Sequence, residues 1–103
     1  MGVLLYADDP HGIEIDDRTL AHIKVVILGR LRRQECFTLS WIRAASTGSG
    51  RETIWLAPSI PLRFRLDDPD GRPLNREWLN QLSATADRGD LRIIPEPEAA
   101  IAG

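Results

Sequence analysis

The run Glu52-Thr53-Ile54-Trp55-Leu56-Ala57-Pro58-Ser59-Ile60-Pro61-Leu62-Arg63-Phe64-Arg65-Leu66 decides the fold of this chain. Pro58 and Pro61 bracket a corner, because proline removes a backbone donor and fixes φ. After the second proline, apolar side chains alternate strictly with arginines, which indicates a strand with one buried face and one solvated face. The run therefore predicts two strands, at about 52–57 and 61–66, in a half-buried sheet.

Further strand patterns flank this run on both sides. The expected strands span residues 3–6, 13–15, 35–42 and 90–94. The first two are separated by turn residues and are expected to pair as a hairpin. Within 35–42, one face should carry Phe37, Leu39 and Trp41, and the other face Cys36, Thr38 and Ser40.

Two helices are marked by their caps. Asp16 is a good N-cap for a helix that runs to about Arg32, and Asn75 is a good N-cap for a helix over about 76–88 that Gly89 stops. The first helix should be deeply buried, since an apolar stripe at helical spacing is widened by further apolar residues. These are Leu20, Ile23, Ile27 and Leu31 in the stripe, with Val25, Val26 and Leu28 beside it.

The predicted order of elements is ββαβββαβ. Strands and helices alternate irregularly, so the expected class is α+β, with a mainly antiparallel sheet and two helices packed on one face. A chain of 103 residues fits one domain. We expect that domain to span 1–98, followed by a loose C-terminal tail over 99–103.

The composition excludes several classes of protein. The chain is 43% hydrophobic, as expected for an ordinary globular domain. It contains no apolar run long enough to cross a membrane and no signal-peptide pattern at its start. We therefore expect a soluble cytoplasmic protein with no membrane association. Cys36 is the only cysteine, which excludes an intrachain disulfide and a cysteine-based zinc cluster.

Charge is segregated along the chain even though the formal net charge is only -2. Residues 30–65 hold seven of the arginines against two glutamates, while both ends are acidic. The candidate contact residues in this basic segment are Arg43, Arg51, Arg63, Arg65 and Trp55. Arginines around an exposed aromatic would suit a nucleic-acid backbone with base stacking. The alternative is a solvated sheet face whose charges discourage edge aggregation.

Residue types that carry catalysis are scarce. His11 lies in a turn beside Asp8 and Asp9, where a weak divalent-metal site competes with a plain solvated turn. His22 falls off the apolar stripe and is predicted to lie on the surface. Cys36 is predicted to be a small filler residue rather than a nucleophile. Trp41, Trp55 and Trp78 are expected in or beside the core rather than as ligand platforms.

Two loops resemble binding loops only superficially. The run 47–51 (Thr-Gly-Ser-Gly-Arg) lacks the Gly-Lys-Ser/Thr ending of a P-loop, and it feeds a strand rather than a helix. Asp67, Asp68 and Asp70 with Gly71 lack the spacing and the terminal glutamate of a calcium loop. We interpret them as a hairpin loop and an acidic turn, and we expect no cofactor and no metal.

Five runs carry a family resemblance that covers nearly the whole chain. They are 15–22 (Ile-Asp-Asp-Arg-Thr-Leu-Ala-His), 37–41 (Phe-Thr-Leu-Ser-Trp), 54–62 (Ile-Trp-Leu-Ala-Pro-Ser-Ile-Pro-Leu), 75–78 (Asn-Arg-Glu-Trp) and 95–97 (Pro-Glu-Pro). They resemble a family of small actinobacterial proteins of about this length that often carries the label "ATP-dependent DNA ligase". The resemblance implies a connection with DNA ligation or repair.

The residues themselves do not support ligase chemistry in this chain. Such a ligase attaches AMP to the lysine of a Lys-x-Asp-Gly motif, whereas the only lysine here, Lys24, is followed by Val-Val-Ile. We therefore expect a non-enzymatic binding or interaction domain with an unknown protein partner. The alternative is a nucleic-acid-binding accessory domain that acts beside a separate ligase through its basic central segment.

Overall fold

The computed structural model describes residues 1–43, 50–67 and 72–98. Within them, the strands are β1 (Gly2–Tyr6), β2 (Ile13–Ile15), β3 (Phe37–Ile42), β4 (Arg51–Leu56), β5 (Leu62–Arg65) and β6 (Asp90–Arg92), and the helices are α1 (Asp17–Arg32) and α2 (Arg76–Ala86). The order ββαβββαβ and the α+β class are therefore confirmed. Strand bounds differ from the expected ones by at most two residues: β1 and β4 begin one residue earlier, whereas β3 begins two residues later and β6 ends two residues earlier.

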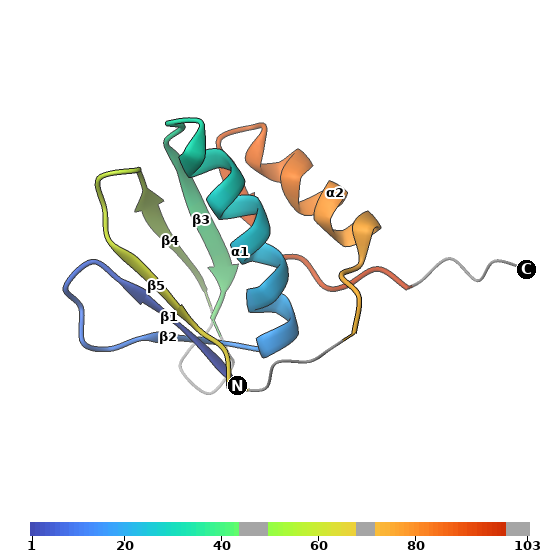
Figure 1. The fold of residues 1–103 in the computed structure, drawn as a ribbon, viewed down its shortest axis with the longest axis horizontal. Helices are drawn as coiled ribbons and strands as arrows, with labels where there is room; N and C mark the ends of the chain where they lie inside the picture. The colour runs from blue at the N-terminus through green and yellow to red at the C-terminus, as the bar shows by residue number, and fades with distance from the viewer. Residues whose placement is uncertain (44–49, 68–71, 99–103) are drawn as a thin grey trace, which may run out of the picture.

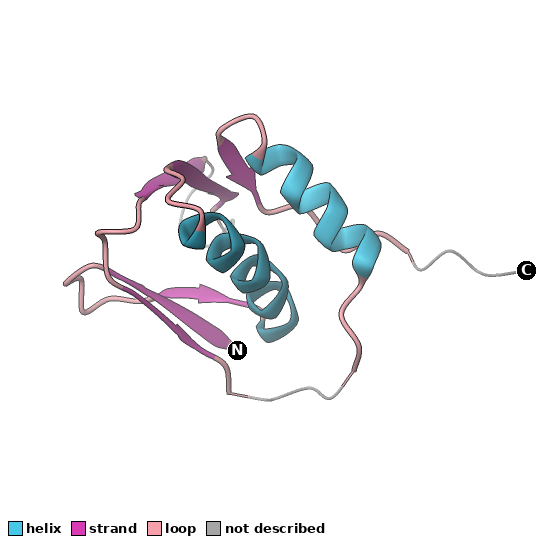
Figure 2. Cartoon of the chain, turned by 45° about the horizontal axis from the view of Figure 1, so that its top comes forward, coloured by secondary structure: helices cyan, strands magenta, loops and turns pink. Residues whose placement is uncertain are grey.

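The strands form two three-stranded sheets instead of the one sheet that the pattern suggested. The β1 sheet has the order β2-β1-β5 and is antiparallel throughout, which confirms the hairpin of β1 and β2. The β3 sheet has the order β4-β3-β6, in which β4 is antiparallel to β3 and β6 is parallel to it. Figure 2 shows the two groups of strands as separate layers beside α1.

The proline corner explains this division. Residues 57–61 end β4 and carry the chain from the β3 sheet to the β1 sheet, where β5 pairs with β1. The corner is closed by a turn in which the Ile60 amide donates to the Ala57 carbonyl. A side-chain bond then joins the two sheets directly, since the Tyr6 hydroxyl donates to the Trp55 carbonyl over 2.7 Å. The consecutive strands β4 and β5 thus lie in different sheets, because the corner directs the chain from the β3 sheet to the β1 sheet.

The predicted helix caps are both present. The side chain of Asp16 accepts a hydrogen bond from the Thr19 amide, and that of Asn75 accepts one from the Trp78 amide. The turn after α2 contains Gly89, whose φ of +91° is a conformation that favours glycine. Sequence chemistry therefore placed both helix starts correctly, and α2 ends slightly earlier than expected.

Both helices lie on the same side of the strands, with α1 between the β1 sheet and α2 (Figure 1). One hydrophobic cluster fills the space between these elements, and its fully buried members include Leu4, Leu20, Ile23, Ile27, Leu39, Leu56, Leu82 and Leu91. The predicted stripe on α1 is therefore the core face, although Val25 is 45% exposed. Neither described helix has the length and apolar character that a membrane span requires. The cytoplasmic location stays a prediction.

Because α2 packs against α1, a second side of α1 is also buried. His22 and Arg30 lie on that side with 0% and 7% exposure, so the prediction of a surface position for His22 is wrong. A residue two positions after Leu20 leaves the sheet-facing stripe but turns toward α2 instead of toward solvent. The sequence pattern of a single stripe could not show this second contact.

Candidate binding surface

The candidate residues of the basic segment divide between the two sheets. Arg63 and Arg65 project from the outer face of β5 in the β1 sheet, as their alternation predicted. Arg51 and Trp55 project from β4 in the β3 sheet, and Arg43 follows β3 directly. The structure therefore does not bring all five residues to one sheet face.

A cavity of about 470 Å³ lies beside Arg63 and Arg65. Both arginines are exposed, and within the described residues neither side chain has a hydrogen bond or ion pair. Asp8 and Asp9 also line this cavity, and their carboxylates offset the positive charge locally. This surface is thus mixed in charge rather than uniformly basic, which weakens its attraction for a polyanion.

The outer face of the β3 sheet is defined by the strand register. Thr38 pairs with Trp55 on one side and Asp90 on the other, and Ser40 pairs with Thr53 and Arg92 in the same way. Since paired residues share a face, this surface consists of Thr38, Ser40, Ile42, Arg51, Thr53, Trp55, Asp90 and Arg92. The opposite face carries Phe37, Leu39 and Leu91 into the core, which confirms the predicted alternation of β3.

Polar groups in the middle of this outer face satisfy one another. The carboxylate of Asp90 accepts hydrogen bonds from the hydroxyls of Thr38 (2.7 Å) and Ser40 (2.6 Å) through one oxygen and from Arg92 (3.1 Å) through the other. Ser40 also bonds the hydroxyl of Thr53 over 2.8 Å. Burial alone would raise the pKa of Asp90, but these hydrogen bonds outweigh burial and lower that pKa below its usual value. Asp90 is therefore a carboxylate at neutral pH.

Two large apolar side chains flank this polar cluster. Ile42 is 70% exposed and Trp55 is 52% exposed. The expectation that Trp55 lies in or beside the core is wrong, because its position in β4 turns it to the outer face. In contrast, the expectation is confirmed for Trp78, which is 2% exposed, and for Trp41, which packs against the core. The outer face of the β3 sheet thus combines exposed apolar groups with polar groups that already have partners.

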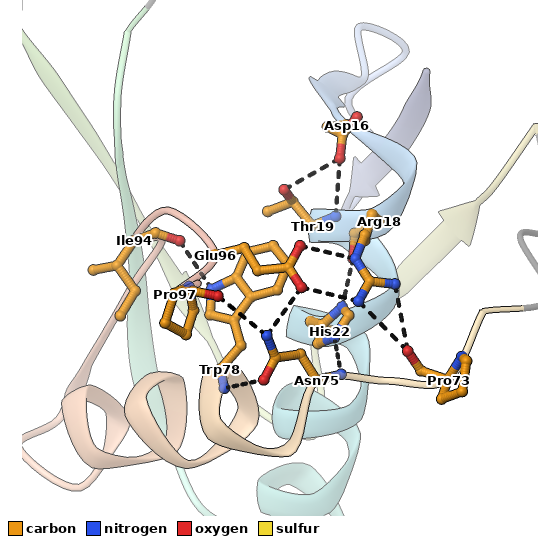
Figure 3. A network of polar contacts seen from close by, with 10 residues as sticks. All are labelled: Asp16, Arg18, Thr19, His22, Pro73, Asn75, Trp78, Ile94, Glu96 and Pro97. Carbon is orange, nitrogen blue, oxygen red and sulfur yellow. Dashed lines mark hydrogen bonds and ion pairs between the residues drawn. The ribbon is translucent and has the colours of Figure 1, made fainter. Parts of the chain in front are cut away.

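A polar network ties α1, α2 and the segment after β6 together (Figure 3). Arg18 forms a two-pronged ion pair with Glu96, with N–O distances of 2.8 and 2.9 Å, and its guanidinium also donates to the Pro73 carbonyl. Asn75 donates to Glu96 over 3.0 Å. The indole N–H of Trp78 donates to the carbonyl of Ile94 over 2.9 Å.

His22 lies at the centre of this network with both ring nitrogens engaged. Its Nε2 accepts a hydrogen bond from the backbone amide of Asn75 over 2.8 Å. In the neutral ring Nδ1 therefore carries the proton and donates to the Arg18 carbonyl over 2.7 Å. The ring also lies 4.4 Å from the ring of Trp78, centroid to centroid. The described contacts make His22 a structural link between the helices rather than a free base.

Glu96 is the most perturbed carboxyl group of the network. Hydrogen bonds from Arg18 and then Asn75 lower its pKa from 4.5 to about 2. Sequence reasoning missed this network, although a signal existed. Residues 18, 22, 26 and 30 recur at i+4 and form a second line along α1, parallel to the apolar stripe.

Arg30, which belongs to the basic segment 30–65, forms its contacts within the fold. Its guanidinium bonds Glu35, the backbone and hydroxyl oxygens of Ser83, and Asp87. A hydrogen bond from Arg33 is the largest cause that lowers the pKa of Glu35. The charge of Arg30 is therefore neutralised inside the domain and adds nothing to an external basic surface.

The remaining sequence candidates give no site. His11 is exposed in its turn, where its amide donates to the Asp9 carboxylate over 2.9 Å. In the described part of the chain, no three metal-binding side chains cluster. Cys36 is exposed, so the interpretation as a packed filler residue is wrong. Residues 47–49 of the glycine-rich loop, residues 68–71 of the acidic turn, and the tail 99–103 lie outside the described residues.

Comparison with known proteins yields one match. The model of the family described as Domain of unknown function (DUF7882) matches residues 1–96, which is nearly the whole described chain. No curated protein and no solved structure matches the chain. The family description names no activity.

Proposed function

We propose that this chain, which belongs to the DUF7882 family, is a non-enzymatic domain that binds a protein partner through the outer face of the β3 sheet. The observation that carries the proposal is the exposure of Trp55 and Ile42 on that one face. Single exposed apolar residues are common, but tryptophan is among the residues that contribute most to protein interfaces. Two such side chains around a satisfied polar cluster suit the centre of an interface.

The polar cluster lowers the cost of covering this face. A partner that covers Ser40, Thr53 and Asp90 removes water from groups that already have hydrogen bonds within the sheet. Burying a polar group is costly mainly when it loses its hydrogen bonds. Apolar contact with Trp55 and Ile42 is then not offset by unpaired polar groups.

The test compares binding by variants that remove exposed apolar surface. Trp55→Ser and Ile42→Ser are expected to keep the circular dichroism spectrum and to lose the partner. Val25→Ser, which removes a half-exposed side chain from α1, is the matched control and should bind like the parent protein. The assay is quantitative cross-linking in cell extract together with sedimentation velocity of the purified protein. Equal partner recovery by all three variants would contradict the proposal.

A second candidate function is a nucleic-acid-binding accessory domain connected with DNA ligation or repair. The guanidinium groups of Arg63 and Arg65 favour it, because they are exposed and have no partner among the described residues. Fluorescence anisotropy with single-stranded, duplex and nicked DNA at two salt concentrations tests it. The Arg63→Ala/Arg65→Ala double variant should weaken binding and reduce its salt dependence. If the double variant binds DNA as the parent does, these arginines are not the contact.

A further inference from the structure

A cavity of about 500 Å³ lies at the edge of the β3 sheet, where the end of α2 meets β6. It is lined by Ala84 and Thr85 of α2, by Arg88 just beyond that helix, and by Asp90 and Arg92 of β6. The last two residues also belong to the outer face of the β3 sheet. The cavity is therefore continuous with the surface that carries Trp55.

Acceptors of Asp90, Thr85 and Ala86 around this cavity already have hydrogen-bond partners. Both oxygens of Asp90 accept bonds from within the sheet. The Thr85 hydroxyl donates to the Leu82 carbonyl and accepts from the Arg92 amide. The carbonyls of Thr85 and Ala86 accept from the amides of Arg88 and Gly89.

Hydrogen-bond donors at the cavity, in contrast, are not all used within the part of the chain that the structure describes. Among the described residues, no group bonds the guanidinium of Arg88, which is exposed. The Arg92 side chain is 56% exposed, and within residues 1–43, 50–67 and 72–98 it bonds Asp90 through Nε alone. Two arginines against one carboxylate give the cavity a formal charge of +1. The available guanidinium donors and the charge of +1 therefore suit a hydrogen-bond acceptor with one negative charge, such as a carboxylate.

Trp55 lies at a distance that one short peptide can span. Trp55, Thr38 and Asp90 are neighbours across three adjacent strands. Two strand spacings make about 10 Å, and an extended chain covers about 3.3 Å per residue, so about three residues join the two positions. The outer face carries Arg51 and Arg92 against the single carboxylate of Asp90, so two copies placed face to face would bring together two surfaces of net positive charge. The charge thus favours an acidic partner over a second copy.

We infer that the outer face of the β3 sheet binds an acidic peptide segment of a partner protein, with an Asp or Glu side chain in the cavity beside Arg88 and Arg92 and an apolar side chain on Trp55. This inference rests on the proposed function and names the chemistry of its partner. The segment crosses the three strands, and its charged and apolar residues are about three positions apart.

A displayed library of random twelve-residue peptides tests the inference. Serine-glycine linkers flank both ends, so that only side chains supply carboxylates, and the whole 103-residue chain is the target. We expect selected peptides to carry an acidic residue about three positions from an aromatic or aliphatic residue. A selected peptide is then labelled, and its affinity is measured by fluorescence anisotropy. Arg88→Glu should weaken the affinity of this peptide about tenfold or more, which corresponds to the loss of one charge-assisted contact.

Matched variants separate this inference from the proposed function. Arg76→Glu makes the same charge change at the other end of α2 and should leave the affinity unchanged. Peptide binding that Trp55→Ser abolishes and Arg88→Glu leaves intact overturns the acidic anchor while the proposed function stands. Binding that neither variant affects overturns both. A selection that yields no binder, or only binders without an acidic residue, also overturns the inference.

Discussion

Replacing His22 by phenylalanine is expected to destabilise the domain strongly. In the parent protein, the rings of His22 and Trp78 lie 4.4 Å apart, centroid to centroid, and the substitution keeps a ring at this position. It removes the acceptor for the backbone amide of Asn75 and the donor to the Arg18 carbonyl. An unpaired, partly buried amide costs about 1–3 kcal/mol, and the second lost bond adds about 1 kcal/mol. The expected loss is therefore about 2–4 kcal/mol of the free energy of unfolding.

Urea denaturation followed by circular dichroism and by tryptophan fluorescence measures this loss. If the free energy of unfolding falls by about 1.5 kcal/mol per molar urea, a loss of about 3 kcal/mol lowers the urea midpoint by about 2 M. His22→Gln is the matched control, since its amide oxygen can still accept from the Asn75 amide. It should lose clearly less stability than His22→Phe.

Two results would refute this reasoning. A midpoint of His22→Phe equal to that of the parent would mean that the Asn75 amide finds another partner at no cost. Equal losses in His22→Phe and His22→Gln would mean that shape, rather than the hydrogen bond to Asn75, explains the effect.

Three further predictions concern the rest of the fold. Because the pKa of Glu96 is about 2 in the folded protein and ordinarily 4.5, its contribution is present above pH 4.5 and is lost as the pH falls toward 2. The parent should therefore lose more of its melting temperature over that range than Glu96→Gln does, and parallel curves would contradict the ion pair as the cause. Gly29→Ala should raise the free energy of unfolding by about 1 kcal/mol, because an added Cβ meets no atom within 4 Å in a helical position. Gly89→Ala should lower it by about 1–2 kcal/mol, since φ is +91° there, and opposite signs in chemical denaturation are the check. Tyr6→Phe should cost about 1 kcal/mol through loss of the bond to the Trp55 carbonyl, and a variant as stable as the parent would show that this bond adds nothing to the contact between the sheets.

Three of the five runs that carry the family resemblance also build the polar network. Arg18 and His22 lie in the first of these runs, Asn75 and Trp78 in the fourth, and Glu96 in the last. Their contacts hold the two helices and the segment after β6 together. These three runs are therefore tied to the fold, whereas the other two, 37–41 and 54–62, supply Thr38, Ser40 and Trp55 to the outer face of the β3 sheet.

The sequence alone determined the features that depend on near neighbours. Caps such as Asp16 and Asn75 act within three residues, and the alternation of Leu62 to Leu66 acts at a spacing of two. These local rules predicted both helix starts, the faces of β3 and β5, and the order of elements.

Only the tertiary structure decided which elements meet. His22 is bonded to a residue 53 positions away, and Arg18 to one 78 positions away, so no local pattern could reveal that they are buried and paired. The same holds for the division into two sheets, for the exposure of Trp55, and for the cavity between Arg88 and Arg92. The physical reason is that a side chain's burial depends on what packs over it, and the packing partner is chosen by the whole chain.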